Sequence, residues 1–170
     1  MRSLLLPLML AWGAGACADP VREKAAAALG DEVAGVRPGP LHRPGQPCLV
    51  CHDGGEVSAF SVAGTVYARA LGGVPVDKVT VQLIDADGRK FQALTNCAGN
   101  FFVRPGEYAP RYPLWTTLSV GAKTIDMESP VFRDGSCASC HTNPKGPASA
   151  GEVYFLLDED AELPATHYCR

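Results

Sequence analysis

From Val57 onward, hydrophobic and polar residues alternate along the chain with a period of two. The hydrophobic positions are Phe60, Val62, Gly64 and Val66 in one segment and Val79, Val81 and Leu83 in the next. This alternation is typical of β-strands with one buried face, and about seven short segments show it or a related apolar pattern. Because no long helical pattern follows residue 57, we predict an all-β fold, an antiparallel sandwich.

Turn signals separate the predicted strands. Residues 85–88 read Asp-Ala-Asp-Gly, which is typical of a hairpin turn. Residues 96–99 read Asn-Cys-Ala-Gly between two apolar segments, and we predict a second hairpin there. The last strand is expected within 152–157.

The chain before these strands has a different character. Asp19 and Pro20 are suited to begin a short Ala-rich helix that Gly30 would end, although the same stretch suits a spacer. Residues 35–47 are interrupted by Pro and Gly, which excludes a helix or a central strand.

The first sixteen residues are typical of a secretory signal. Arg2 precedes a short apolar run, and small residues follow before Cys17. The segment resembles a bacterial lipoprotein signal, in which Cys17 would be lipidated, although Ala14 stands where such signals usually carry Leu. No later segment is apolar for long enough to cross a bilayer, so we expect a mature chain that is soluble and at most tethered.

These features divide the chain into six parts. They are a signal peptide (1–16), a lipidated spacer or short helix (17–35), a first loop that contains Cys-x-x-Cys-His (36–56), the β-sandwich (57–127), a second such loop (128–150), and the last strand with the C-terminal tail (151–170).

Two short units carry the candidate chemistry. Pro47–His52 and Ser136–His141 each contain Cys-x-x-Cys followed directly by His. This pattern is typical of covalent haem attachment, in which the thiols bind the porphyrin and the next His binds the iron. The chain thereby resembles multihaem c-type cytochrome lipoproteins. The residues implied are Cys48, Cys51, Cys137 and Cys140 for attachment of two c-type haems, and His52 and His141 as proximal iron ligands.

Three other interpretations of the cysteines compete. A zinc site would need ligands from both units, which lie far apart in sequence. A redox dithiol would need a βαβ setting that the pattern does not show, and two local disulfides would leave the adjacent histidines without a role.

The sequence offers three candidates for the sixth ligands of the irons. Of the four histidines, His42 and His167 remain as candidate distal ligands. His42 could serve either haem. Met127 is the alternative, although its place at the end of an apolar strand also suits core packing.

The remaining cysteines are Cys17, Cys97 and Cys169. An odd number in an exported protein is unusual, so we expect lipidation of Cys17 and a disulfide between Cys97 and Cys169.

One segment resembles a second family. Gly64 to Val66, Val76 to Gly88 and Thr95 to Val103 look like the strand and hairpin motifs of the carboxypeptidase regulatory-like, transthyretin-like domains. The resemblance implies a transthyretin-like (Ig-like) sandwich, with haem loops before its first and last strands, in a domain type that is generally non-catalytic.

Together the patterns lead us to expect an electron-transfer protein rather than an enzyme. Its partners would be a redox protein or other cytochromes, and the bacterial outer membrane through the lipid, on the periplasmic side or at the cell surface. The balance of 15 basic and 18 acidic residues shows no basic run, so nucleic acid is not expected as a partner. The alternatives are a surface binding lipoprotein stapled by disulfides, and a haem-based sensor or peroxidase with one open iron position.

Overall fold

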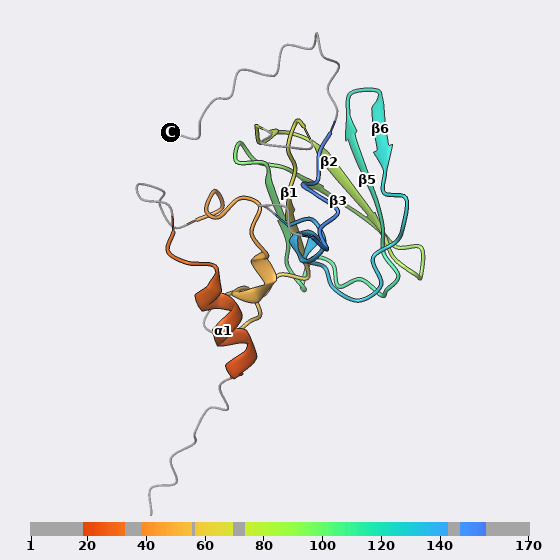
Figure 1. The fold of residues 1–170 in the computed structure, drawn as a ribbon. Helices are drawn as coiled ribbons and strands as arrows, with labels where there is room; N and C mark the ends of the chain where they lie inside the picture. The colour runs from red at the N-terminus through yellow and green to blue at the C-terminus, as the bar shows by residue number, and fades with distance from the viewer. Residues whose placement is uncertain (1–18, 33–38, 56, 70–73, 143–146, 156–170) are drawn as a thin grey trace, which may run out of the picture.

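The described part of the protein is mostly β, with one short α-helix (Figure 1). The computed structural model describes residues 19–32, 39–55, 57–69, 74–142 and 147–155. Within these ranges no helix is long and apolar enough to cross a membrane. The elements are α1 (Pro20–Ala28), the 3-10 turn η1 (Cys48–Val50), β1 (Val62–Thr65), β2 (Thr80–Ile84), β3 (Lys90–Leu94), β4 (Asn100–Val103), β5 (Trp115–Val120), β6 (Lys123–Asp126) and the 3-10 turn η2 (Cys137–Ser139).

The strands form two antiparallel sheets. β1 pairs with β4 in one, and the other has the order β3-β2-β5-β6. In the larger sheet Val81 and Leu83 of β2 are fully buried, while the alternating residues Thr80 and Gln82 are only half-buried. This alternation confirms the period of two that predicted the strand.

One hydrophobic cluster joins the two sheets. It takes residues from both strands of the smaller sheet and from the central strands of the larger one, and Phe155 near the end of the described chain belongs to it. Its fully buried members include Val62, Val66, Val79, Val81, Leu83, Val103 and Phe155. Because these side chains come from both sheets, burial of this cluster fixes the position of β1 relative to β2 and β5.

The turn between β2 and β3 confirms the first predicted hairpin. The carboxylate of Asp85 is buried and accepts hydrogen bonds from the backbone N–H groups of Asp87 and Arg89, and Gly88 adopts the left-handed conformation. Burial acts to raise the pKa of Asp85, but backbone hydrogen bonds from Arg111 and Arg89 and the Arg89 guanidinium outweigh it. The net effect lowers the pKa of this carboxyl.

The prediction of a second hairpin at 96–99 is wrong. β3 pairs with β2, whereas β4 crosses to the other sheet and pairs with β1. The side chain of Asn96 accepts hydrogen bonds from the backbone N–H groups of Ala98 and Asn100, so it closes a tight corner between the sheets. The turn itself was predicted correctly, but the two strands that it connects pair with distant strands and not with each other.

The predicted last strand is present only as a short pairing. The N–H of Tyr67 donates to the carbonyl of Val153 at 2.8 Å, and the N–H of Phe155 donates to the carbonyl of Tyr67 at 2.8 Å. This bridge is parallel, so the expectation of a purely antiparallel arrangement fails at this position. Residues 156 and 157 of the prediction lie outside the described chain.

The helix expected near the N-terminus is present. The side chain of Asp19 accepts hydrogen bonds from the N–H groups of Val21 and Arg22, and Pro20 occupies the first helical position. Figure 1 shows α1 beside η1 and away from the larger sheet. The helix has no buried residue, so its position depends on polar contacts with the loop that carries the first Cys-x-x-Cys-His unit.

Candidate functional site

The first Cys-x-x-Cys-His unit folds into a tight turn. η1 begins at Cys48, whose carbonyl accepts hydrogen bonds from the N–H groups of Cys51 at 3.2 Å and His52 at 2.9 Å. Cys48 is half-buried, and Cys51 is exposed. The turn thus presents two thiols and one imidazole from a single compact segment.

The second unit repeats this geometry. The carbonyl of Cys137 accepts from the N–H groups of Cys140 at 3.2 Å and His141 at 2.8 Å. Again the first thiol is half-buried and the second is exposed. Two segments far apart in sequence therefore have the same backbone hydrogen bonds and the same order of exposure.

Strand β1 supports the second unit directly. The N–H of Ala63 donates to the carbonyl of Gly135 at 2.9 Å, and Ala63 pairs with Ser136 in a parallel bridge. A Cβ atom on Gly64 would lie 2.8 Å from the Cβ and 2.9 Å from the Sγ of Cys137. Only glycine allows η2 to approach the strand this closely.

The same strand holds the loop before the first unit. The buried hydroxyl of Thr65 accepts a hydrogen bond from the N–H of Gly45 at 2.7 Å and donates to Oδ1 of Asn100 at 2.7 Å. The amide of Asn100 in turn donates to the carbonyl of His42 at 3.1 Å. β1 and β4 therefore position His42 through a buried polar chain.

Both predicted proximal histidines are oriented by a backbone carbonyl. Nδ1 of His52 lies 2.9 Å from the carbonyl of Ser58, and Nδ1 of His141 lies 2.7 Å from the carbonyl of Gly151. A carbonyl can only accept, so each Nδ1 carries the proton and Nε2 keeps its lone pair. This is the tautomer in which an imidazole binds a metal through Nε2.

His42 lies opposite His52 in the first unit. Their ring centres are 5.7 Å apart, with an interplanar angle of 33°. Nδ1 of His42 donates a hydrogen bond to the carbonyl of Gly39, which leaves the lone pair of its Nε2 available to bind a metal. Two imidazole nitrogens on opposite sides of one metal ion lie about 4 Å apart, which puts the ring centres about 6 Å apart. The observed spacing is close to this value.

The two rings border a cavity of about 590 Å³, here called the histidine cavity. Its volume is within the range of small-molecule and cofactor sites. Cys48 and Cys51 also line it, so both thiols and the histidine of the first unit meet His42 here. The rest of the lining is Leu29, Gly39, Pro40, Arg43, Gln46, Pro47, Val57, Ser58, Phe60, Asn100, Phe101, Phe102 and Arg104.

Aromatic rings form one wall of this cavity. Phe60 stacks on His52 with ring centres 4.0 Å apart and an interplanar angle of 12°. Phe102 stacks on Phe60 at 4.8 Å. This stack fixes the plane of the His52 ring in addition to the hydrogen bond on its Nδ1.

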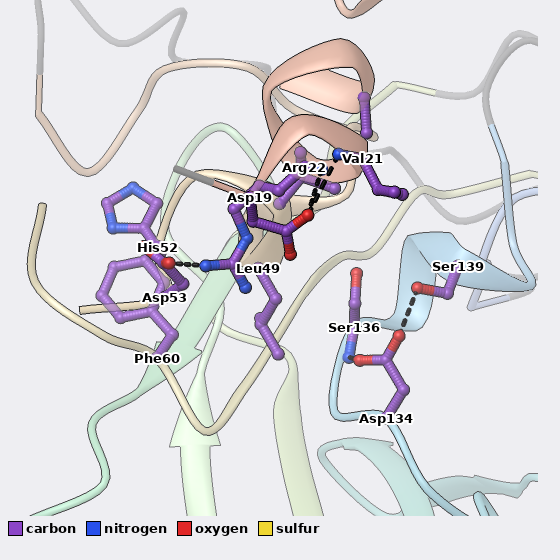
Figure 2. Close-up of a pocket in the computed structure, with 12 residues that line it drawn as sticks. Asp19, Val21, Arg22, Leu49, His52, Asp53, Phe60, Asp134, Ser136 and Ser139 are labelled. Carbon is purple, nitrogen blue, oxygen red and sulfur yellow. Dashed lines mark hydrogen bonds and ion pairs between the residues drawn. The ribbon is translucent and has the colours of Figure 1, made fainter. Parts of the chain in front are cut away.

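A second cavity of about 430 Å³, here called the inter-unit cavity, lies between α1, the first unit and the second unit. Figure 2 shows the residues that line it. Arg22 of α1 forms an ion pair with Asp53 on one side. On the other side, the carboxylate of Asp134 accepts from the Ser136 N–H at 2.8 Å and the Ser139 hydroxyl at 2.7 Å. The two units therefore face each other across one opening.

A thiol of the first unit influences a thiol of the second. Burial raises the pKa of Cys48 and raises that of Cys137 to about 12, and the charge of Cys48 adds to the rise at Cys137. As free thiols both would stay protonated at neutral pH.

No group of three or more His, Cys, Asp or Glu side chains that could hold a metal ion occurs in the part of the chain that the structure describes. A haem iron needs only two protein ligands, because the porphyrin supplies the other four. His42 and His52 meet that smaller requirement.

The other predicted residues are placed less completely. Cys97 is disulfide-bonded, but Cys17, His167 and Cys169 lie outside the described residues, so the Cys97–Cys169 pairing and the role of His167 stay predictions. Met127 follows β6, its N–H donating to the carbonyl of Thr116 at 3.0 Å, and it lines neither cavity.

Sequence reasoning missed three residues of the histidine cavity: Phe60, Asn100 and Arg104. Phe60 was assigned only to a strand, and no local motif marks the other two. The carbonyls that orient His52 and His141 could not be found either, because a carbonyl group carries no sequence signal.

Comparison with protein-family models, with curated protein sequences and with solved structures gives no match.

Proposed function

We propose that this protein is a dihaem c-type cytochrome that transfers electrons at the bacterial cell envelope. The observation that carries the proposal is the repeated geometry of the two units. Each unit has a 3-10 turn with one half-buried and one exposed thiol, and each is followed by a histidine whose Nδ1 is bound to a backbone carbonyl. That combination is what covalent haem attachment with axial ligation through Nε2 requires.

The residues present fit a haem at the first unit. Cys48 and Cys51 would hold it covalently, and His52 and His42 would bind its iron from opposite sides. A bound haem supplies a one-electron iron couple. Phe60 and Phe102 of the histidine cavity would cover part of the group, and the carbonyls of Ser58 and Gly39 would hold the two imidazoles in the ligating tautomer.

The geometry favours electron transfer over substrate turnover at the first unit. The ring centres of His42 and His52 are 5.7 Å apart, and with His42 as the sixth ligand no position would remain for a reacting molecule. Cys51 is exposed, so one attachment edge of a haem would lie at the surface, where a partner protein could approach. Ligation by two histidines would give a lower potential than ligation by His and Met.

The second unit would bind its haem through Cys137, Cys140 and His141. Sequence alone supplies the candidate for its sixth ligand, which is His167. Because both units lie against β1, the two haems would be held by one short strand and its partner. Such a shared support suits exchange of electrons between them.

Two further features belong to the proposal. The two sheets would form a transthyretin-like sandwich, with the haem loops before its first and last strands. Lipidation at Cys17 would tether the exported protein to the outer membrane, on its periplasmic or outer side, close to a redox partner.

The visible spectrum tests the proposal. The protein, exported with haem attachment enabled, is expected to show two low-spin c-type haems. His42→Ala should convert one of them to high spin, because the sixth position opens. Met127→Ala is the matched control and should leave both low-spin.

A colourless protein would point instead to a surface binding lipoprotein. A high-spin haem in the wild type would favour a sensor or peroxidase at one unit. Two low-spin haems in His42→Ala would contradict the assignment of His42.

A further inference from the structure

Among the described residues, the histidine cavity is lined by basic but not acidic side chains. Arg43, Arg104 and the two histidines line it, and no described Asp or Glu does. A haem carries two propionate carboxylates, which need cationic partners when water is partly excluded. The charge of the lining therefore suits the anionic edge of the group proposed for this site.

Arg43 already has a structural task. Its guanidinium donates to Oε1 of Gln46 at 2.8 Å and to the carbonyl of Gly30 at 2.8 Å. A longer contact of 3.5 Å reaches the carbonyl of Leu29. These bonds tie the end of α1 to the first haem-binding loop, so Arg43 has few donors left for a ligand.

Arg104 is differently placed. It is exposed and follows β4 directly, and its guanidinium carbon lies 5.8 Å from the ring centre of Phe102. Glu107 accepts from the backbone N–H of Arg104 at 2.9 Å. Within the described chain the guanidinium itself has no hydrogen bond or ion pair.

The aromatic wall connects this arginine to the iron ligand. Rings stack from His52 to Phe60 and from Phe60 to Phe102, and the Arg104 guanidinium lies over the last of them. Arg104 is thus at the outer end of the wall, where the solvent-facing edge of a haem would be. A guanidinium also matches a carboxylate with two parallel hydrogen bonds.

We infer that Arg104 binds a propionate carboxylate of the first haem and thereby raises its reduction potential. This inference rests on the proposed haem binding. A cation beside the haem favours the reduced iron, which has one positive charge fewer. Arg104 would therefore help to set the potential of one haem and leave the other nearly unchanged.

The test uses the full haem-loaded protein and two measurements. Redox titration gives the midpoint potential of each haem, and redox-difference infrared spectroscopy follows the propionate carboxylate bands. Arg104→Gln should lower one midpoint potential and shift carboxylate bands. Arg104→Lys should return that potential towards the wild-type value, because the ammonium keeps the charge.

Arg111→Gln is the matched control. Arg111 is also exposed, and its guanidinium forms an ion pair with Asp87 at 3.0 Å. Neither residue lines the histidine cavity. This variant should leave both potentials and the carboxylate bands unchanged.

Three results would overturn the inference while leaving the haem proposal intact. They are unchanged carboxylate bands in Arg104→Gln, equal shifts of potential in Arg104→Gln and Arg111→Gln, and equal shifts in Arg104→Gln and Arg104→Lys. A wild-type protein without haem would instead contradict the proposed function itself.

Discussion

Replacing Gly64 by Ala tests whether β1 carries the second unit as closely as the structure indicates. The new Cβ would lie 2.8 Å from Cβ and 2.9 Å from Sγ of Cys137, and 3.0 Å from a ring carbon of Phe101. Ordinary contacts between such atoms are about 3.5–4.0 Å. The methyl group would therefore overlap three atoms at once.

Two opposing effects set the size of the change. Inserting a methyl group into a packed region costs about 1–3 kcal/mol, and three simultaneous overlaps at Gly64 place this case in the upper part of that range. Ala in place of Gly also restricts the unfolded chain, which stabilises the fold by about 0.4–1 kcal/mol. The overlap dominates, so we expect a net loss of about 1–2 kcal/mol in the free energy of unfolding.

Urea denaturation followed by circular dichroism measures this loss. Thermal unfolding should show a melting temperature lower by about 2–8 °C. Gly106→Ala is the matched control, because Gly106 is exposed and a Cβ there would meet nothing within 4 Å. It should leave the stability unchanged or raise it slightly. A Gly64→Ala protein as stable as the wild type would refute the close packing of η2 on β1.

Three other predictions follow from buried polar groups and cysteines. Thr65→Val removes both hydrogen bonds of the hydroxyl, so the N–H of Gly45 and Oδ1 of Asn100 each lose a partner. The free energy of unfolding measured in urea should therefore fall by about 1–3 kcal/mol. Asp85 has a lowered pKa in the folded state, so its contribution to stability is full above its ordinary value of 3.8 and is lost as the pH falls through the folded value. Asp85→Asn should therefore be less stable in urea at neutral pH, and its stability should depend less on pH below about 4 than that of the wild type; equal acid dependence would contradict this. Peptide mapping under non-reducing conditions should find Cys97 linked to Cys169, and any other partner for Cys97 would disprove that pairing.

Local patterns in the sequence predicted local structure well. The alternation around Val81 gave a strand, the turn at 85–88 gave a hairpin, and Asp19 with Pro20 began a helix. In each case the residues that carry the signal also make the interaction, for example the Asp85 carboxylate with its own turn. Such features need no information about distant segments.

Pairings between distant segments could not be predicted in this way. The turn at 96–99 was clear, but the transfer of β4 to the smaller sheet depends on the contact between β1 and β4. The sequence left open which haem His42 would serve. The structure brings it to His52 because Asn100, on β4, binds the carbonyl of His42.

The candidate site likewise combines residues that local motifs predict with features that depend on distant segments. Its cysteines and proximal histidines could be read from two short motifs. The features that shape it could not: the glycine under Cys137, the carbonyls on the two Nδ1 atoms and the stack of Phe60 on His52 all arise from folding. The repeated hydrogen bonding of the two units is the structural addition to the sequence pattern.

The mass of the intact exported protein tests the central claim most directly. After extraction with acidified organic solvent, which removes haem that is not covalently bound, the account predicts a mass higher than that of the processed, lipidated chain by two haem groups. Cys137→Ser with Cys140→Ser should reduce the increase to one haem. A protein whose mass equals that of the chain without haem would contradict the account.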